Sequence, residues 1–255
     1  MTDYFSKQAD QYARFRPRYP MELYEFLQRL VFDHDCAWDV ATGNGQAAMM
    51  LAERFKKVIA TDISEAQLKN ASPHRRITYK NEAAEKTSLA DRSVDLITVA
   101  QAAHWFRFDE FYREVDRVLK PNGVIAIFGY GFFEPTPPQL ITTAQAKLDA
   151  AIKEFSHVTL EKHWKPEAKL LWNQYKSIPF PFDLQLAPSF NMEITLNLEE
   201  LLGYFSTWSA VQAYQDELKI NPLDALKVKL RACWENPVER KHFTWKVAMK
   251  VGRKR

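Results

Sequence analysis

The sequence predicts an α/β fold with a doubly wound, mostly parallel sheet, an antiparallel C-terminal strand and a helical, aromatic lid insertion. Three observations predict it. Short apolar segments alternate with amphipathic ones along the first half of the chain, an order typical of parallel sheets. Two glycines, Gly43 and Gly45, directly follow the first apolar segment. Residues 242–251 alternate between apolar and polar side chains, which indicates a half-exposed strand that returns to the sheet.

Composition narrows the class of protein. Of the 255 residues, 46% are apolar and 26% are charged, an ordinary balance for a folded globular chain. The net charge of +3 disfavours a dedicated nucleic-acid binder. Cys36 and Cys233 are too few for a disulfide framework or a metal site. The first 25 residues are charged and contain no apolar stretch, so we expect no signal peptide. The few cysteines favour a cytoplasmic protein, the longest apolar run is too short for a membrane segment, and no metal is expected because no residues have metal-ligand spacing.

The first half of the chain contains the sheet-forming segments. Pro17 and Pro20 stop any N-terminal helix, and a helix over 21–32 follows because Leu23, Leu27 and Leu30 share one face. The strands expected next are 37–41, 57–61, 77–80, 94–100 and 124–128. The helices between them are one with Ala48, Leu51, Ala52 and Phe55 on its buried face, one over 64–71 and one over 108–119. We expect residues 1–131 to form an N-terminal flap and the sheet core.

The second half is more aromatic and less regular. Prolines at 135, 137 and 138 interrupt the chain after the last core strand. Further strands are expected at 177–182 and 190–196, and helices at 198–206, 208–218 and 223–234. We expect residues 132–255 to form a lid over an acceptor pocket and to end in strands that rejoin the sheet.

The glycine pair is the first candidate ligand site. The chain holds only 7 glycines, yet two of them stand in three residues after the first strand. In open parallel sheets, ligands bind outside the carboxyl ends of the strands. Glycine lets a ligand approach the backbone closely, although a generic tight turn would also explain the pair.

Asp62 ends the second strand and is the second element of this site. A carboxylate at that position can accept both hydroxyls of a ribose, although a surface or capping role is the alternative. The pattern from Gly43 to Ala48 also fits the dinucleotide fingerprint G-x-G-x-x-A. Asp39, just before the glycines, would repel a pyrophosphate but favour an ammonium group. Asp39 and Asp62 therefore suit S-adenosylmethionine better than NAD.

These motifs resemble those of the class I S-adenosylmethionine-dependent methyltransferases, which have a Rossmann-like fold. The family's D-x-G-x-G-x-G motif reads DVATGNGQA here, with Ala41 and Ala47 in place of the outer glycines. The segment SVDLITVAQAAHWF resembles the fourth-strand motif, and LKPNG resembles a family turn. The resemblance implies that these residues bind the cofactor: Asp39, Ala41, Thr42, Gly43, Asp62, Ile63, Gln67, Ala84, Glu85 and Gln101.

A closer resemblance is to the type 11 branch with the trans-aconitate and ubiquinone-biosynthesis methyltransferases. Its pattern Y-x-x-x-R-P-x-Y-P begins here at Tyr12 and includes Arg16. The pattern implies a flap over the cofactor formed by Tyr12 and Arg16, with Arg16 near a carboxylate; an exposed basic arm is the alternative. Tyr4, Trp105 and Trp208 are the expected acceptor contacts, although a core role is the alternative for Trp208.

The resulting hypothesis is direct in-line methyl transfer to a small molecule. A carboxylic acid is one candidate acceptor and would need no base, and the 13% aromatic content allows a flat or apolar acceptor instead. A hydroxyl or acidic carbon would need a base, for which His104 is the candidate because histidine titrates near neutrality; a structural histidine is the alternative. An NAD-type oxidoreductase and a non-catalytic S-adenosylmethionine-binding module also remain. No hydrolase or metalloenzyme motif is present.

Overall fold

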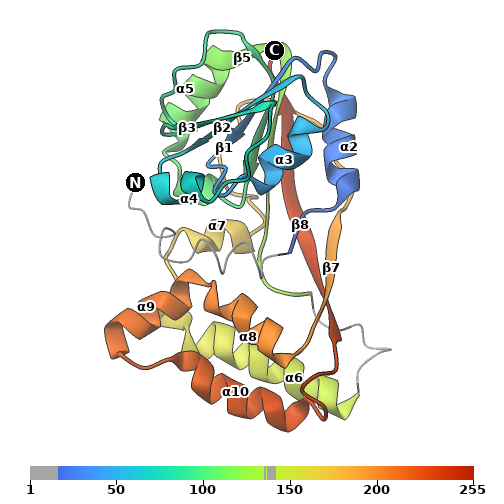
Figure 1. The fold of residues 1–255 in the computed structure, drawn as a ribbon, viewed down its shortest axis with the longest axis vertical. Coiled ribbons are helices and arrows are strands. Elements are labelled where there is room, and N and C mark those ends of the chain that lie inside the picture. Colours follow the sequence, from blue (N-terminus) through green and yellow to red (C-terminus); the bar gives the residue numbers. More distant parts are fainter. Residues whose placement is uncertain (1–16, 135, 137–141) are drawn as a thin grey trace.

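The computed structural model describes residues 17–134, 136 and 142–255. Figure 1 shows a sheet flanked by helices in the upper part of the molecule and a group of helices in the lower part. The long strand β8 (Lys241–Arg253) runs between the two parts. The predicted flap and acceptor residues Tyr4, Tyr12 and Arg16 lie outside the described residues.

One mixed sheet forms the core, with the strand order β3-β2-β1-β4-β5-β8-β6 and β7 paired to β8. Strands β1 to β5 pair in parallel, whereas β8 runs antiparallel to β5, β6 and β7. The strands before β8 are β1 (Cys36–Val40), β2 (Lys57–Asp62), β3 (Ile77–Asn81), β4 (Val94–Ala100), β5 (Leu119–Tyr130), β6 (Asp183–Leu184) and β7 (Asn191–Leu196). This topology confirms the predicted fold class. The strand order reverses between β1 and β4, the position where open parallel sheets bind ligands.

Helices cover both faces of the sheet because both faces of its strands are apolar. Two hydrophobic clusters lie on opposite faces of the sheet. Neighbouring residues of β1 belong to different ones: Ala37 is part of the first cluster and Trp38 is part of the second. The first cluster packs against α2 (Met21–Leu30) and α3 (Gln46–Ala52), and the second against α5 (Phe108–Val118). The short α4 (Glu65–Lys69) contacts β2 and β3.

The lower part is built from helices of the second half of the chain (Figure 1). They are α6 (Thr143–Glu154), α8 (Leu198–Ser206), α9 (Ser209–Leu218) and α10 (Pro222–Cys233), and their buried side chains continue the first cluster. Asn197 caps α8: its Oδ1 accepts the Glu200 N–H at 2.9 Å, and Glu200 Oε2 accepts the Asn197 N–H at 2.9 Å. The three helices predicted after residue 197 are confirmed to within one residue, and α6 was not predicted. The division near residue 131 stays a prediction.

Two local predictions were wrong or incomplete. Residues 177–182 form no strand, since Pro179 and Pro181 lack the N–H groups that a sheet needs; only Asp183–Leu184 pair with β8. Strand β5 begins at Leu119, five residues earlier than expected. Its first residues form a bulge, because Val94 pairs with Leu119 but Leu96 pairs with Val124, with Asn122 at a φ of 63° inside it.

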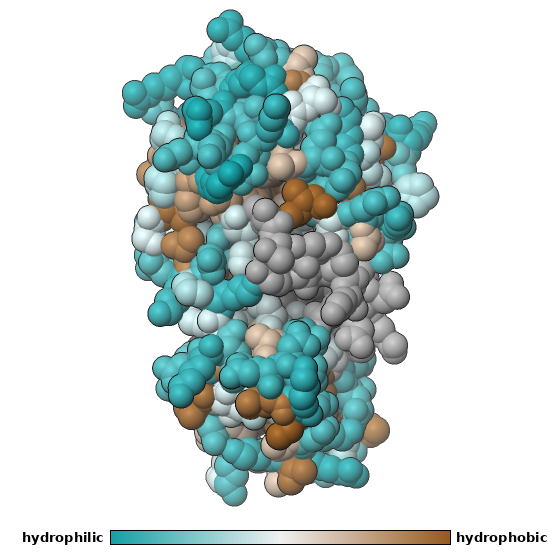
Figure 2. All heavy atoms as spheres, turned by 90° about the vertical axis from the view of Figure 1, so that its left-hand side faces the viewer, coloured by the Kyte–Doolittle hydropathy of each residue, from teal (hydrophilic) through white to brown (hydrophobic). Residues whose placement is uncertain are grey.

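Figure 2 views the molecule from the left of Figure 1: the upper part is mainly hydrophilic, and hydrophobic side chains are scattered over the lower, helical part. Within the described ranges, no helix has the length and apolarity that a bilayer crossing requires.

Candidate cofactor and acceptor sites

A left-handed turn follows β1 and forms the centre of the first site. Three of its residues have positive φ: Ala41 at 51°, Gly43 at 57° and Gly45 at 85°. The turn is held by the Thr42 N–H, which bonds Thr61 O at 2.9 Å, and by the Gly45 N–H, which bonds Thr42 O at 3.0 Å. The two glycines are therefore required by backbone conformation, and Ala41 occupies a conformation that glycine adopts more easily.

Asp39 lies beneath this turn and is 0% exposed. Its Oδ2 accepts the Thr42 hydroxyl at 2.5 Å and its Oδ1 accepts the Thr98 hydroxyl at 2.7 Å. Burial raises the pKa of Asp39 to about 6, although the hydrogen bonds from both threonines oppose the shift. The enclosed carboxylate bonds the turn to β4, and its predicted part in cofactor binding stays a prediction.

Asp39→Asn is expected to change how stability depends on pH. Because the folded-state pKa is raised, the wild type loses stability as pH rises from about 4 to about 6, by about 3 kcal/mol. The variant lacks this loss, so the unfolding free energy of the wild type minus that of the variant should fall over this range. Urea denaturation at several pH values measures the difference. If the wild-type-minus-variant difference in unfolding free energy stays constant to within about 0.5 kcal/mol over this pH range, the raised pKa of Asp39 is contradicted.

Asp62 joins the end of β2 to the same turn. Its Oδ2 accepts the Gly43 N–H at 2.8 Å, and its Oδ1 accepts the Ser64 N–H at 2.8 Å. Gln67 is buried beside Gly43, since a Cβ on that glycine would lie 3.9 Å from Gln67 Oε1. Ile63 is half-buried next to Asp62. Asp62, Ile63, Gln67 and the turn therefore lie together, as the sequence predicted.

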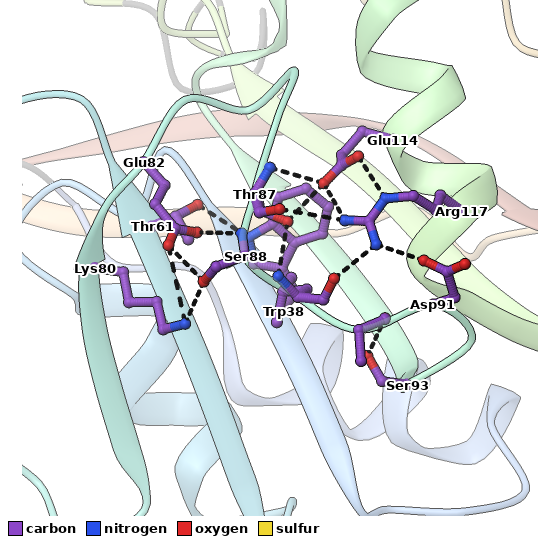
Figure 3. Close-up of polar contacts among 12 residues, drawn as sticks. Trp38, Thr61, Lys80, Glu82, Thr87, Ser88, Asp91, Ser93, Glu114 and Arg117 are labelled. Carbon is purple, nitrogen blue, oxygen red and sulfur yellow. Dashed lines mark hydrogen bonds and ion pairs between the residues drawn. The ribbon is translucent and has the colours of Figure 1, made fainter.

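A polar network fastens the loop that carries Ala84 and Glu85 (Figure 3). Glu114 on α5 accepts the Thr87 N–H at 2.8 Å and the Thr87 hydroxyl at 2.6 Å. Arg117 donates to Glu114 at 2.6 Å and to the carbonyl of Leu89 at 2.7 Å. Burial raises the pKa of Glu114, but the hydrogen bonds from Arg117 and Thr87 outweigh it and hold the pKa below its ordinary value.

The ends of that loop are also anchored. Ala84 is buried, and Glu85 Oε1 accepts the Arg107 N–H at 3.2 Å. At the other end, Arg117 pairs with Asp91 at 2.6 Å. The network explains how a segment without regular structure can present Ala84 and Glu85 in a fixed place. No sequence pattern indicates the contacts of Glu114 and Arg117 with this loop.

Arg117→Ala is expected to loosen this loop. It leaves the buried Glu114 carboxylate without its cation and should lower the unfolding free energy by about 1–3 kcal/mol. If Ala84 and Glu85 contact the cofactor, affinity for S-adenosylhomocysteine should fall about tenfold. Calorimetric titration and urea denaturation measure the two effects. Arg113→Ala is the matched control on the same helix, because Arg113 is exposed and bonds only its own helix at Asp109 O; equal effects in both variants would contradict the network's role.

A pocket that is partly open to solvent brings together four of the predicted residues: Gln101, His104, Trp105 and Trp208. The other lining residues come from the end of β5, the lid and the short α7 (Ala168–Trp172). They are Tyr130, Gly131, Phe132, Trp164, Ala168, Leu171, Trp172, Tyr204 and Ser209. The pocket therefore lies between the sheet and the lid.

Gln101 connects the ends of two neighbouring core strands. It follows β4 with a φ of 59°. Its side-chain amide donates to Tyr130 O at 2.9 Å and accepts the Tyr130 N–H at 2.8 Å, so it is fixed against the end of β5. Gln101 lines the pocket and follows the strand adjacent to β1, whose end carries the left-handed turn.

His104 lies in the short 3₁₀ helix η2 (Ala103–Trp105) and is only 8% exposed. Its Nδ1 is 3.2 Å from the Tyr175 hydroxyl, and its ring packs against Trp105 with centroids 4.7 Å apart. Burial lowers the pKa of His104 to about 4. The expectation of a near-neutral pKa is therefore wrong: the imidazole is neutral at pH 7 and is a weak base.

Tyr175 contacts the pocket lining at His104, and the sequence did not reveal this residue. It follows α7, where Gln174 has a φ of 58° and the Tyr175 N–H reaches back to Leu170 O at 2.8 Å. Together with the Gln174 N–H bonded to Leu171 O at 2.8 Å, this is a Schellman-type helix end. Tyr175 is fully buried by this turn, and its hydroxyl reaches His104.

Comparisons with known proteins agree with this architecture. The profile of the methyltransferase domain family matches residues 38–127. A Dictyostelium discoideum protein assigned as a methyltransferase is 35% identical over 213 residues, which are 83% of this chain and 79% of that protein. A Saccharomyces cerevisiae protein assigned as an S-adenosylmethionine-dependent methyltransferase is 28% identical over 140 residues, 51% of this chain and 48% of its own length.

A solved structure from Anaeromyxobacter dehalogenans, assigned as a type II methyltransferase, is similar over nearly the whole fold. It has a TM-score of 0.83 and 37% sequence identity, and the match covers 94% of this chain and 98% of that one. The sheet order, the turn after β1 and these relatives agree on one conclusion. The chain belongs to the class I S-adenosylmethionine-dependent methyltransferases.

Proposed function

We propose that this methyltransferase transfers a methyl group directly, in line, to a small-molecule acceptor held in the pocket beside Gln101. The observation that supports this is the adjacency of the two sites. The turn follows β1 and Gln101 follows β4, and these strands pair in parallel up to Val40 and Val99. Cofactor and acceptor groups would therefore meet at one edge of the sheet.

The residues around the turn suit S-adenosylmethionine. Asp62 would bind the ribose, and Ala84, Glu85 and Ile63 would surround the adenine. Ala41, Thr42 and Gly43 would present backbone groups to the amino-acid end, with Gln67 behind the turn and Gln101 near the methionine moiety. Asp39 would act by holding the turn. Tyr12 and Arg16 would close over the cofactor as the predicted flap.

The chemistry requires little beyond positioning. The cofactor supplies an electrophilic methyl group on a sulfonium; the acceptor lone pair forms the new bond while the C–S electron pair stays on sulfur. The pocket residues would hold the acceptor in line, and such orientation can contribute about 7–11 kcal/mol. The ring of Trp105 would stabilise the positive charge near the reacting methyl group.

His104 would orient the acceptor through hydrogen bonding. As a weak base with a pKa of about 4, it is poorly matched to removing a proton from a hydroxyl at neutral pH. A carboxylic acid acceptor, which needs no base, and a flat acceptor both remain consistent with in-line transfer. A cytoplasmic location and membership of the type 11 branch stay predictions.

Two measurements test the proposed function. Calorimetric titration with S-adenosylhomocysteine should show micromolar binding, and NADH should not bind. Incubation with S-adenosylmethionine and a panel of small acceptors should release S-adenosylhomocysteine only in the presence of an acceptor. Binding of NADH in place of S-adenosylhomocysteine would favour the oxidoreductase. Tight S-adenosylhomocysteine binding with no turnover of any acceptor would favour a non-catalytic module.

A further inference from the structure

The geometry points to a planar, uncharged aromatic compound as the methyl acceptor, in preference to a carboxylate. This inference names the acceptor class of the pocket beside Gln101 and so rests on the proposed function. It depends on three features of that pocket: its aromatic walls, the absence of charged side chains among its described lining residues, and the polar groups at the end beside Gln101.

The walls are aromatic rings at varied angles. Trp164 and Trp172 meet edge to face, with centroids 5.4 Å apart and planes at 87°. Phe132 is tilted by 36° to Trp172 at 5.2 Å and by 67° to Trp208 at 5.7 Å. The Trp164 indole N–H donates to Ser156 O at 2.8 Å, so this ring presents apolar surface to its neighbours. A planar aromatic ligand can stack on or abut such rings, with a gain beyond the area that it buries.

Charge is the second feature. Of the lining residues within the described ranges, none is Asp, Glu, Lys or Arg. Lys165 is not part of the lining and contacts it at Trp105, where its Nζ is 5.5 Å from the ring centroid. A carboxylate that leaves water needs a cation or several hydrogen bonds to offset its desolvation. The described lining residues supply no Lys or Arg cation.

The third feature is a polar end formed by the lining residues Gln101 and His104, with the buried Tyr175 hydroxyl in contact with His104. A Cβ added to Gly129 would lie 2.8 Å from Gln101 Oε1 and 3.1 Å from Tyr175 Oη, so these two groups meet over the backbone of β5. His104 Nδ1 is engaged by Tyr175, which leaves Nε2 as the ring nitrogen for a ligand. His104 is buried and neutral, so it offers a hydrogen bond but no positive charge. That end suits a hydroxyl, carbonyl or ring nitrogen on an otherwise apolar ring.

The test compares matched ligands on protein saturated with S-adenosylhomocysteine. At about pH 7.5, 2-naphthol is neutral and 2-naphthoate is ionised. Calorimetric titration should show that 2-naphthol binds at least about tenfold more tightly than 2-naphthoate, and also more tightly than its saturated analogue decahydro-2-naphthol. Equal or tighter binding of 2-naphthoate would overturn the uncharged class, and equal binding of the saturated analogue would overturn the planar one.

Variants of residues in the pocket wall show whether 2-naphthol binds in this pocket. Trp172→Ala should weaken 2-naphthol binding at least about tenfold and leave S-adenosylhomocysteine binding unchanged. Trp105→Leu is a second variant of the wall in case the first fails to fold. Phe26→Ala is the matched control, because Phe26 is a half-buried ring outside the pocket that packs on Phe190. Unchanged 2-naphthol binding in both wall variants would overturn the assignment of this pocket.

Failure of the proposed function and failure of the proposed acceptor class give different results in these experiments. Absence of S-adenosylhomocysteine binding in the wild type would contradict the proposed function itself. Normal S-adenosylhomocysteine binding with a preference for 2-naphthoate would contradict only the acceptor class. In that case Arg16→Ala would show whether the N-terminal segment supplies the cation, as the sequence first suggested.

Discussion

Asp62→Ala is expected to lower the affinity for S-adenosylhomocysteine by at least about 100-fold. In the proposed complex the carboxylate forms two charge-assisted hydrogen bonds to the ribose, each contributing about 1.5–3 kcal/mol. In the protein itself it accepts the N–H groups of Gly43 and Ser64, both at 2.8 Å, so its loss also loosens the turn. Calorimetric titration of both proteins measures the change.

Two controls separate binding from folding in that experiment. Asp183→Ala removes a carboxylate at the edge of the sheet that pairs with Arg255, and it should leave S-adenosylhomocysteine binding unchanged. A thermal melt of Asp62→Ala checks that the variant is folded. An affinity within about threefold of the wild type in a folded Asp62→Ala protein would contradict the ribose role.

Gly45→Ala is expected to lower the unfolding free energy by about 2–5 kcal/mol and to weaken cofactor binding with it. The φ of 85° costs a non-glycine residue about 1–2 kcal/mol. The added Cβ would also clash with Tyr79 Oη and lie 3.1 Å from Tyr79 Cε1, an overpacking that adds about 1–3 kcal/mol. Urea denaturation measures the total.

Two further variants separate the backbone contribution to this loss of unfolding free energy from the overpacking contribution. Gly45→Ala combined with Tyr79→Ala should recover the overpacking part and retain the backbone part. Ala41→Gly, at a φ of 51°, should change stability by less than about 1 kcal/mol, because relief of the left-handed strain is offset by the flexibility of glycine. A Gly45→Ala protein as stable as the wild type would contradict the geometry of the turn.

Local sequence order explains why the first site could be predicted. Asp62 and Gly43 belong to one βαβ unit, and β1 pairs in parallel with β2 up to Thr61, so the spacing alone brings them to one edge. The final strand was predictable because apolar and polar side chains alternate over residues 242–251, a pattern typical of a half-exposed strand. Residues 177–182 alternate in a similar way, but their prolines prevent the pairing that alternation suggests.

The second site depended on contacts between distant segments. His104 and Tyr175 are 71 residues apart, and the turn that aims Tyr175 has no glycine to mark it. The pKa of His104 follows from its burial, which a single sequence does not reveal. The same holds for Glu114 and Arg117, whose contacts with the loop at Thr87 cross 27 and 30 residues. Helix and strand periodicity predicts elements, but not which side chains meet between them.

In the proposed complex, the turn after β1 binds the cofactor with its sulfur toward the pocket beside Gln101. A crystal structure of the complex with S-adenosylhomocysteine tests it most directly. We expect the ribose hydroxyls on Asp62 and the sulfur facing the space lined by Gln101, His104 and Trp105. A ligand bound away from Gly43, or with its sulfur directed away from that space, would contradict the claim.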